Sequence, residues 1–405
     1  MSKSKTLGVL GNGQLGRMFA QAAQDLGFAV VVFDPEAQKA GALSPAAQVS
    51  DAFINADFSD TAALQSLADR CAAVTTEFEN VSADALAYLA KPSSAVLVAP
   101  KADAVRIAQN RVLEKNHFVG CGVPIAPYVV VDSQQQLGSV PDHFYPAILK
   151  TARMGYDGKG QVTVNNADEL RAAWLGLSRA ACVLEQRLAL ASECSVLLAR
   201  QVGTNGKAHM IHWPVQRNVH VHGILATTEV TCSPSASQAL LDVALTSAAQ
   251  KIATDLNYVG VLCVEFFILA DGSWVVNEIA PRPHNSGHIT MNASSLSQFE
   301  AQVRVLAGLP LVQPRQHSCG VMLNVLGDVW FDDASSQADE QPREPDWARV
   351  LALGTADVGV HVHLYGKTEA RRARKMGHIN VTAQTLAVAR DVAAHIQKEL
   401  GSVPN

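Results

Sequence analysis

A short segment with the sequence VEFFILADGSWVVNE, residues 264–278, constrains the fold of this chain more than any other stretch. Two apolar runs flank Asp271-Gly272, a dipeptide that strongly indicates a two-residue hairpin loop of type I′. If these two residues form the whole loop, counting outward from it places Glu265 opposite Glu278. The sequence therefore predicts an antiparallel strand pair with two glutamates directly opposed on one face.

The opposed glutamates indicate a metal site. Facing Cβ atoms in such a pair lie roughly 5 Å apart, so two unscreened carboxylates repel and weaken the sheet. A divalent cation reverses this repulsion, and carboxylates that share a cation with waters and phosphate oxygens are typical of Mg²⁺ at a nucleotide site. The alternative is a solvated sheet face, but the expected neighbours Phe267, Trp274 and Val276 are too apolar for open solvent. Asn277 is expected on the other face unless the strand twists or bulges there.

A glycine-rich loop, ILKTARMGYDGKGQ, occupies residues 148–161. Glycine allows a backbone to approach a phosphate and to offer it N–H groups, and Lys150 and Lys159 add positive charge. The spacing is not that of a P-loop. An ordinary surface loop is the alternative, which the nearby carboxylate hairpin disfavours. Residues 184–186, at the end of a predicted strand, could offer backbone groups to an adenine base.

The N-terminal segment carries the pattern G-x-G-x-x-G between an apolar strand and a helix, and Asp34 ends the next apolar run. This is the layout of a dinucleotide-binding fingerprint, so an NAD-dependent oxidoreductase is one hypothesis. That hypothesis leaves the carboxylate hairpin and the glycine-rich loop unexplained. The other hypothesis is that the motif, at residues 11–16, is the wall of a substrate pocket. We favour the second, with Gln14 in this wall and Glu77 facing the substrate.

Three regions of different pattern follow one another along the chain. Strand-like and helix-like segments alternate over residues 1–110 and predict an open parallel sheet of Rossmann type. Residues 111–308 combine antiparallel hairpins with a helix from about residue 238 to 256, which predicts an α+β domain. Residues 309–405 predict a small C-terminal domain closed by a helix.

Charge and cysteine usage disfavour several classes of protein. The net charge of −5 argues against a nucleic-acid-binding protein, which usually has a broad basic face. No apolar stretch reaches the roughly 18 residues that a membrane span needs. The seven cysteines are scattered and form no C-x-x-C, so we expect buried, reduced thiols rather than a nucleophile or a zinc site. These features predict a cytoplasmic protein without nucleic-acid or membrane partners.

Several stretches together resemble the ATP-grasp superfamily and, within it, the N5-carboxyaminoimidazole ribonucleotide synthase family. They are LGNGQLGRM, TTEFENV, GYDGKGQ, EIAPRPHNSGH, SQFE and YGK…RRARKMGH, and they span nearly the whole chain. The resemblance implies a mixed α/β and α+β fold: a Rossmann-like domain, a central ATP-grasp domain of antiparallel sheets and helices, and a small C-terminal domain. It also implies a homodimer whose product passes to a separate N5-carboxyaminoimidazole ribonucleotide mutase.

The activity that the resemblance implies is that of an ATP-dependent, carbon–nitrogen bond-forming ligase of de novo purine biosynthesis. ATP phosphorylates bicarbonate to carboxyphosphate, which carboxylates the exocyclic amine of 5-aminoimidazole ribonucleotide and yields ADP and phosphate. Neighbouring ATP-grasp enzymes, such as a formate-using glycinamide ribonucleotide transformylase or a biotin carboxylase, are the alternatives. A regulatory nucleotide-binding protein that does not turn ATP over is a third possibility.

The motifs and the resemblance together assign candidate residues to each role. We expect ATP to bind Arg111, Lys150, Gly155, Tyr156, Asp157, Gly158, Lys159, Gly160, Gln161, Glu185, Gln186, Arg187, Leu188, Glu193, His220, Asn277 and Glu278. We expect the ribonucleotide and the carboxylation chemistry at Gln14, Glu77, Tyr156, Asp157, Arg282, His284, Asn285, Ser286, Lys367 and Arg374. The expected Mg²⁺ ligands are Glu265 and Glu278.

Four of these residues are expected to act in catalysis: Asp157, Arg282, His284 and Lys367. The Arg282 guanidinium can hold a carboxylate or phosphate bidentately and stabilise developing charge. His284, with an ordinary pKa near neutrality, could take the proton of the amine, although a lone histidine is often structural. The basic stretch YGKTEARRARKMGH is either a solvated turn or a phosphate site. In an acidic protein we favour capture of the substrate 5′-phosphate by Lys367 and Arg374.

Overall fold

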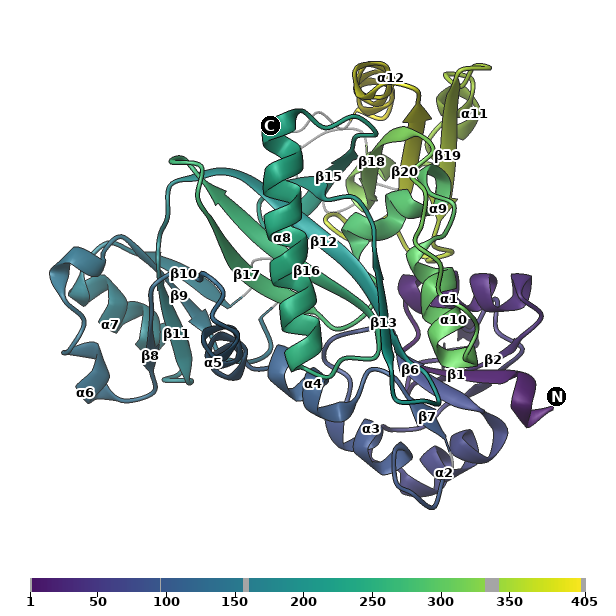
Figure 1. Cartoon of the computed structure of the whole chain (residues 1–405), viewed down its shortest axis with the longest axis horizontal. Helices are drawn as coiled ribbons and strands as arrows, with labels where there is room; N and C mark the ends of the chain where they lie inside the picture. The colour runs from purple at the N-terminus through teal and green to yellow at the C-terminus, as the bar shows by residue number, and fades with distance from the viewer. Residues whose placement is uncertain (1, 95, 156–159, 332–341, 402–405) are drawn as a thin grey trace.

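The computed structural model describes residues 2–94, 96–155, 160–331 and 342–401 (Figure 1). The N-terminal part forms a five-stranded sheet in the order β5-β2-β1-β6-β7, and all its strand pairs are parallel, as predicted. Its strands are β1 (Thr6–Leu10), β2 (Ala29–Phe33), β5 (Ala52–Ile54), β6 (Ala73–Thr76) and β7 (Leu97–Val98). The apolar runs of β1 and β2 are buried on both faces, which explains why they do not alternate.

Helices cover both faces of this parallel sheet. The helices α2 (Thr61–Arg70) and α3 (Ala83–Leu89) pack on one face, in a core with Val31 and Val74. The helix α1 (Gln14–Asp25) packs on the other, together with α10 (Gln298–Ala307) from much later in the chain. One hydrophobic core therefore joins the N-terminal sheet to the central part of the protein.

A four-stranded antiparallel sheet, in the order β10-β9-β11-β8, forms the unit at the left of Figure 1. Its strands are β8 (Tyr128–Val131), β9 (Ala147–Thr151), β10 (Gln161–Val164) and β11 (Cys182–Gln186). The helix α7 (Ala167–Gly176) packs on it through Leu170 and Trp174. The helix α5 (Arg111–Cys121) lies where this unit meets the large sheet. This sheet carries Lys150 at the end of β9 and Glu185 on β11.

The third sheet is the largest, with the order β17-β16-β12-β14-β15-β18-β20-β19 and with β13 paired to β12. Its strands are β12 (Leu190–Val202), β13 (Ala208–His212), β14 (Gln216–Val221), β15 (Ile224–Val230), β16 (Gly260–Leu269), β17 (Trp274–Ala280), β18 (Cys319–Leu326), β19 (Val358–Leu364) and β20 (Lys375–Ala383). The long helix α8 (Ala236–Asp255) crosses its face in Figure 1, and α12 (Leu386–Glu399) covers the C-terminal strands.

The C-terminal strands continue the central sheet. Strand β18 pairs with β15, so the backbone hydrogen bonds run without a break across the predicted boundary at residue 309. The mixed architecture expected from the sequence is confirmed, whereas its exact domain limits stay a prediction. Within the described part of the chain, no helix combines the length and apolar character that a membrane span requires. All seven cysteines are free thiols, and six of them are buried.

The hairpin pairs Glu265 with Glu278, as predicted, although its turn differs from the predicted one. Near the turn, Ile268 pairs with Trp274, and the Leu269 N–H donates to the Ser273 carbonyl oxygen at 2.8 Å. The loop therefore contains the three residues 270–272, of which only Gly272 has a positive φ. This moves the register by one residue. A bulge at Asn277 moves it back, because Glu265 faces Glu278 while the next residue, Phe266, faces Val276.

The two irregularities decide which side chains share the face of the glutamates. Phe267 lines the cavity beside them, as predicted. The placement of Trp274 and Val276 on that face is wrong, because both pack against Phe266 in the core on the opposite side of the sheet. The bulge leaves Asn277 in the cavity wall, the exception that the sequence left open.

Candidate active site

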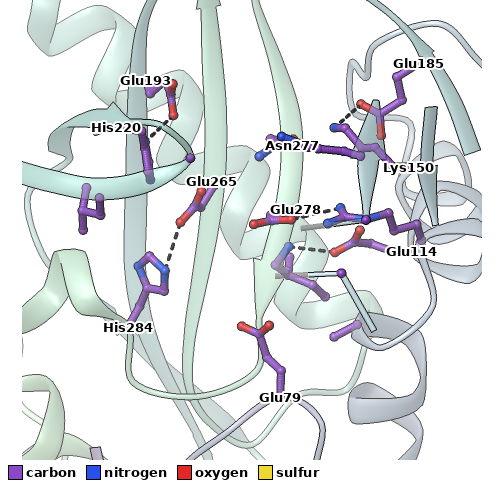
Figure 2. Close-up of a pocket in the computed structure, with 18 of the residues that line it drawn as sticks. Glu79, Glu114, Lys150, Glu185, Glu193, His220, Glu265, Asn277, Glu278 and His284 are labelled. Atoms are coloured by element: carbon purple, nitrogen blue, oxygen red, sulfur yellow. Dashed lines mark hydrogen bonds and ion pairs between the residues drawn. The ribbon is translucent and has the colours of Figure 1, made fainter. Parts of the chain in front are cut away.

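A cavity of about 1060 Å³ lies between the three sheets, and most of the predicted site residues line it (Figure 2). These are Gln14, Glu77, Arg111, Lys150, Gly155, Gly160, Gln161, Glu185, Gln186, Arg187, Leu188, Glu193, His220, Glu265, Asn277, Glu278, Arg282, His284 and Asn285. The predicted residues that share this cavity are up to 271 positions apart in the chain (Gln14 to Asn285). The roles assigned to them remain predictions, but their proximity is a property of the fold.

Seven predicted residues are not among the described residues that line this cavity. Four of them, Tyr156, Asp157, Gly158 and Lys159, lie outside the described part of the chain. Ser286 is fully buried behind the wall, where its Oγ lies 2.9 Å from Nδ1 of His284. Lys367 donates to the Lys375 carbonyl oxygen at 2.6 Å, and Arg374 donates to the Glu369 carbonyl oxygen at 2.7 Å. Lys375 itself, which the sequence did not single out, lines the cavity.

The opposed glutamates have different electrostatic surroundings. Burial and the adjacent Glu278 carboxylate raise the pKa of Glu265 to about 8. Burial also acts to raise the pKa of Glu278, but the charges of Arg111 and Lys150 outweigh it and lower that pKa. An Arg111 guanidinium nitrogen lies 3.1 Å from Oε2 of Glu278. The two opposed carboxylates, of which Glu265 is buried and Glu278 has a side chain that is 40% exposed, are a set of hard oxygen donors that fits Mg²⁺.

A buried ion-pair cluster lies beside this pair, on the side of the four-stranded sheet. Lys150 Nζ donates to Oε2 of Glu185 at 2.9 Å, and Lys115 Nζ lies 3.3 Å from Oε1 of the same carboxylate. Lys115 also donates to the Asn277 carbonyl oxygen at 3.1 Å. Its side chain is fully buried. The Lys115 ammonium therefore links Glu185 to the bulge in β17.

Sequence analysis missed Lys115 and its neighbour Glu114. Glu114 accepts a hydrogen bond from the Ile279 backbone N–H at 2.8 Å, and burial together with Glu278 raises its pKa to about 8. The signal was present, because Arg111, Glu114 and Lys115 are three and four positions apart and lie on one face of a helix. Such a charged face usually faces solvent, so the pattern alone did not indicate burial.

Two histidines of the site each face a carboxylate. Nε2 of His284 lies 3.0 Å from Oε1 of Glu265, while its Nδ1 accepts from the Ser286 backbone N–H at 3.3 Å. The proton of a neutral ring is then on Nε2, and burial holds the pKa of His284 well below its ordinary value. In this arrangement neither nitrogen has a free lone pair, so its role as a base stays a prediction.

The other histidine, His220, is oriented by Glu193. Its Nδ1 lies 2.6 Å from the Glu193 carboxylate. Burial acts to lower the pKa of His220, but the hydrogen bond that its ring donates to Glu193 and the charge of Glu265 outweigh it, and the pKa is raised. A raised pKa favours the charged form of this imidazole, which would suit the predicted contact of His220 with ATP.

The glycine motif at the start of α1 holds a carboxylate from the protein itself. The Glu77 oxygens accept from the Gly13 N–H at 2.9 Å and the Gly16 N–H at 3.1 Å. A Cβ atom at Gly13 would lie only 2.8 Å from Oε1 of Glu77. Glu77 therefore fills the helix N-terminus where a dinucleotide fold holds pyrophosphate. Asp34 is used internally as well, since its Oδ1 accepts from the Asn12 side chain at 2.7 Å.

We expect no binding of NADH, because the groups of the dinucleotide fingerprint already have partners within the protein. The glycine motif binds Glu77, and Asp34 accepts from Asn12. A fluorescence titration of NADH should show no saturable change, whereas Mg-ATP should raise the melting temperature of the same sample. A saturable NADH signal that survives excess ATP would contradict the assignment of this motif to the wall of a substrate pocket.

Comparisons with known proteins agree with this geometry. Residues 4–109 match the model of the ribonucleotide synthetase preATP-grasp domain, 116–299 that of the ATP-grasp domain, and 320–391 that of the phosphoribosylaminoimidazole carboxylase C-terminal domain. N5-carboxyaminoimidazole ribonucleotide synthase from Brucella melitensis is 38% identical over 94% of this chain and 96% of its own length. The relative of the same name from Bacillus subtilis is 36% identical over 93% and 91%.

Solved structures of synthases with this activity in their names also match nearly the whole chain. The Thermus thermophilus N5-carboxyaminoimidazole ribonucleotide synthetase superimposes with a TM-score of 0.83 at 33% identity and covers 98% of this chain and 99% of its own. The synthase from Aspergillus clavatus, solved with ADP and 5-aminoimidazole ribonucleotide, gives a TM-score of 0.80 at 28% identity over both complete chains.

Proposed function

Since this chain belongs to the N5-carboxyaminoimidazole ribonucleotide synthase family, we propose that it carboxylates the exocyclic amine of 5-aminoimidazole ribonucleotide with ATP and bicarbonate. It is an ATP-dependent ligase of the ATP-grasp superfamily. In the proposed reaction ATP phosphorylates bicarbonate, and the resulting carboxyphosphate delivers its carboxyl group to the amine. The products are the N5-carbamate, ADP and phosphate, as a step of de novo purine biosynthesis.

The observation that carries the proposal is the position of the glutamate pair between two different halves of one cavity. Figure 2 shows Glu265 and Glu278 at the centre, the Lys150–Glu185 pair on one side and His284 on the other. The first half offers buried cations for a polyphosphate. The second half offers Arg282 and imidazole groups for a small anion and an amine. Two such half-sites around a pair of carboxylates fit phosphoryl transfer from ATP to bicarbonate.

The residues of the first half would bind and orient the nucleotide. Lys150 and Arg111 would contact its phosphates, and Glu185, which also pairs with Lys115, holds Lys150 in place. Glu265 and Glu278 would hold Mg²⁺, which supplies neutralisation of phosphate charge when bound. A short-lived acyl phosphate would require that bulk water be kept from the centre of the cavity, where Glu265 is buried.

The residues of the second half would bind the anion and the ribonucleotide. Arg282 would stabilise charge on the carboxyphosphate. Lys367 and Arg374 would bind the substrate 5′-phosphate. Burial and the charge of Arg374 lower the pKa of Lys367 to about 8, and a bound phosphate would offset the repulsion between these two cations. A homodimer, transfer of the product to a separate mutase and a cytoplasmic location are further parts of this proposal.

The test is ADP release measured with bicarbonate and 5-aminoimidazole ribonucleotide each omitted in turn. We expect full release only when both are present, and a carbamate product that is labelled when bicarbonate is labelled. Release that is unaffected by omission of the ribonucleotide would contradict the substrate assignment. Release that instead requires glycinamide ribonucleotide and formate would support the neighbouring ATP-grasp activity.

A further inference from the structure

The guanidinium of Arg282 is paired with a carboxylate from the protein itself. Its Nη2 forms an ion pair with Oε1 of Glu79, and its Nη1 donates to the Pro283 carbonyl oxygen at 2.9 Å. Its Nε is buried and has no hydrogen-bond partner. A guanidinium carries five N–H donors, and an unsatisfied buried donor costs free energy. Arg282 therefore has one buried N–H donor, on Nε, without a partner, while Glu79 occupies the donor on Nη2.

Glu79 can leave Arg282 without a change in the backbone. Its carbonyl oxygen accepts from the Gln109 side chain at 2.6 Å, which fixes the main chain of the loop after β6. Its side chain is 36% exposed, whereas that of Arg282 is 16% exposed. Figure 2 shows the Glu79 carboxylate pointing into the cavity, below Glu278. A change of side-chain rotamer alone could thus move the carboxylate away from the guanidinium.

The carboxylate of Glu79 has the shape and charge of the anion that the proposed reaction requires. Bicarbonate and the carboxyl end of carboxyphosphate are planar and accept two parallel hydrogen bonds, as a glutamate does. Replacing one such anion by another at Arg282 keeps the guanidinium paired throughout. A tetrahedral anion such as sulfate also competes for this donor pair, and it must displace Glu79 first.

We propose that Glu79 is an internal substitute for the substrate anion, which pairs with Arg282 in the free enzyme and is displaced when bicarbonate binds. This inference rests on the proposed function for the identity of the anion, but not for the exchange itself. Glu79 is a positioning residue here: it keeps Arg282 oriented and lowers the affinity of the site for anions that cannot react. The exchange replaces one ion pair by another, and no covalent bond is made or broken.

The test compares wild type with Glu79→Gln, which removes the charge and keeps the size of the side chain. Sulfate binding to the ADP-bound protein is measured by calorimetry, without ribonucleotide and without turnover. We expect Glu79→Gln to bind sulfate about tenfold more tightly, since each tenfold corresponds to about 1.4 kcal/mol, the size of one charge-assisted contact. Arg282→Gln should abolish this binding in both backgrounds, and Glu300→Gln, on α10, is the charge-matched control.

Steady-state kinetics separate this role from a direct contact with the ribonucleotide. In Glu79→Gln the KM for bicarbonate should fall and inhibition by sulfate should strengthen, with little change in the KM for the ribonucleotide. Unchanged sulfate affinity, or a raised ribonucleotide KM alone, would overturn the proposal. If Glu79→Gln does not fold, Glu79→Asp serves instead, since a shorter carboxylate pairs less well and should shift the affinity in the same direction.

The two proposals can fail separately. An increase in sulfate affinity together with ADP release that does not depend on the ribonucleotide would support the exchange at Arg282 and reject the proposed substrate. Unchanged sulfate affinity together with ADP release that depends on the ribonucleotide would reject only the exchange at Arg282.

Discussion

Glu278→Gln is expected to lower the rate of ADP release at least about a hundredfold at saturating substrates, because even outer-shell changes at metal sites cost tenfold to a hundredfold. The substitution removes one of two opposed carboxylates that would hold Mg²⁺. It also leaves the Arg111 guanidinium, 3.1 Å away, without its carboxylate partner. Both changes make the ATP half of the cavity more positive but less able to hold a cation.

The measurement is ADP release over a range of Mg²⁺ concentrations. If Glu278 is a ligand, excess Mg²⁺ should restore part of the lost rate, whereas excess ATP should not. The control is Glu229→Gln, because Glu229 pairs with Arg390 on the surface beside α12 and lies outside this cavity. Activity of Glu278→Gln within a few-fold of wild type would remove the metal role from this residue.

Lys115→Met is expected to cost about 3 kcal/mol of the free energy of unfolding, near the lower end for breaking a buried ion pair. Lys115 is fully buried and lies 3.3 Å from the Glu185 carboxylate. Methionine has a similar length but no charge, so the Glu185 carboxylate keeps only Lys150 as a cationic partner. The Asn277 carbonyl oxygen also loses its donor, which should loosen the bulge beside Glu278.

Urea unfolding followed by circular dichroism gives this free energy of unfolding. Repeating the measurement with Mg-ATP gives the stabilisation that nucleotide binding adds. We expect the variant to lose most of the stabilisation that Mg-ATP confers on wild type. The matched control is Lys251→Met, at an exposed position of α8. A loss below about 0.5 kcal/mol, typical of a surface substitution, would show that the buried pair is not needed.

The hairpin illustrates how far local sequence rules reach. Alternation and the Asp-Gly pair were sufficient to place Glu265 opposite Glu278, and the structure confirms this pair. The prediction of a type I′ turn was wrong. The predicted pairing of the two glutamates is nevertheless correct, because the bulge at Asn277 cancels the register shift that the turn introduces. A bulge depends on how a strand packs against the rest of its sheet, so spacing within the hairpin could not reveal it.

The charged face of α5 illustrates the opposite case. A helix with Arg111, Glu114 and Lys115 on one side is usually solvated, since isolated charges are costly to bury. Here the partners come from β11 and β17, which are distant in sequence, and they turn that face into a buried cluster. Helical spacing was enough to group the three residues. Only the packing of α5 against two sheets decided that they belong to the interior.

The sequence by itself determined the strand and helix patterns, the pairing of Glu265 with Glu278, and most of the predicted site residues that the cavity brings together. It could do so because periodicity, glycine positions and hairpin loops depend on neighbours a few residues away. The tertiary structure alone decided what those elements hold. The N-terminus of α1 is ready for an anion by local rules, and Glu77, 64 residues after Gly13, is the anion that occupies it. Arg282 is likewise held by Glu79, 203 residues earlier, because long-range packing and not local pattern decides which charges meet.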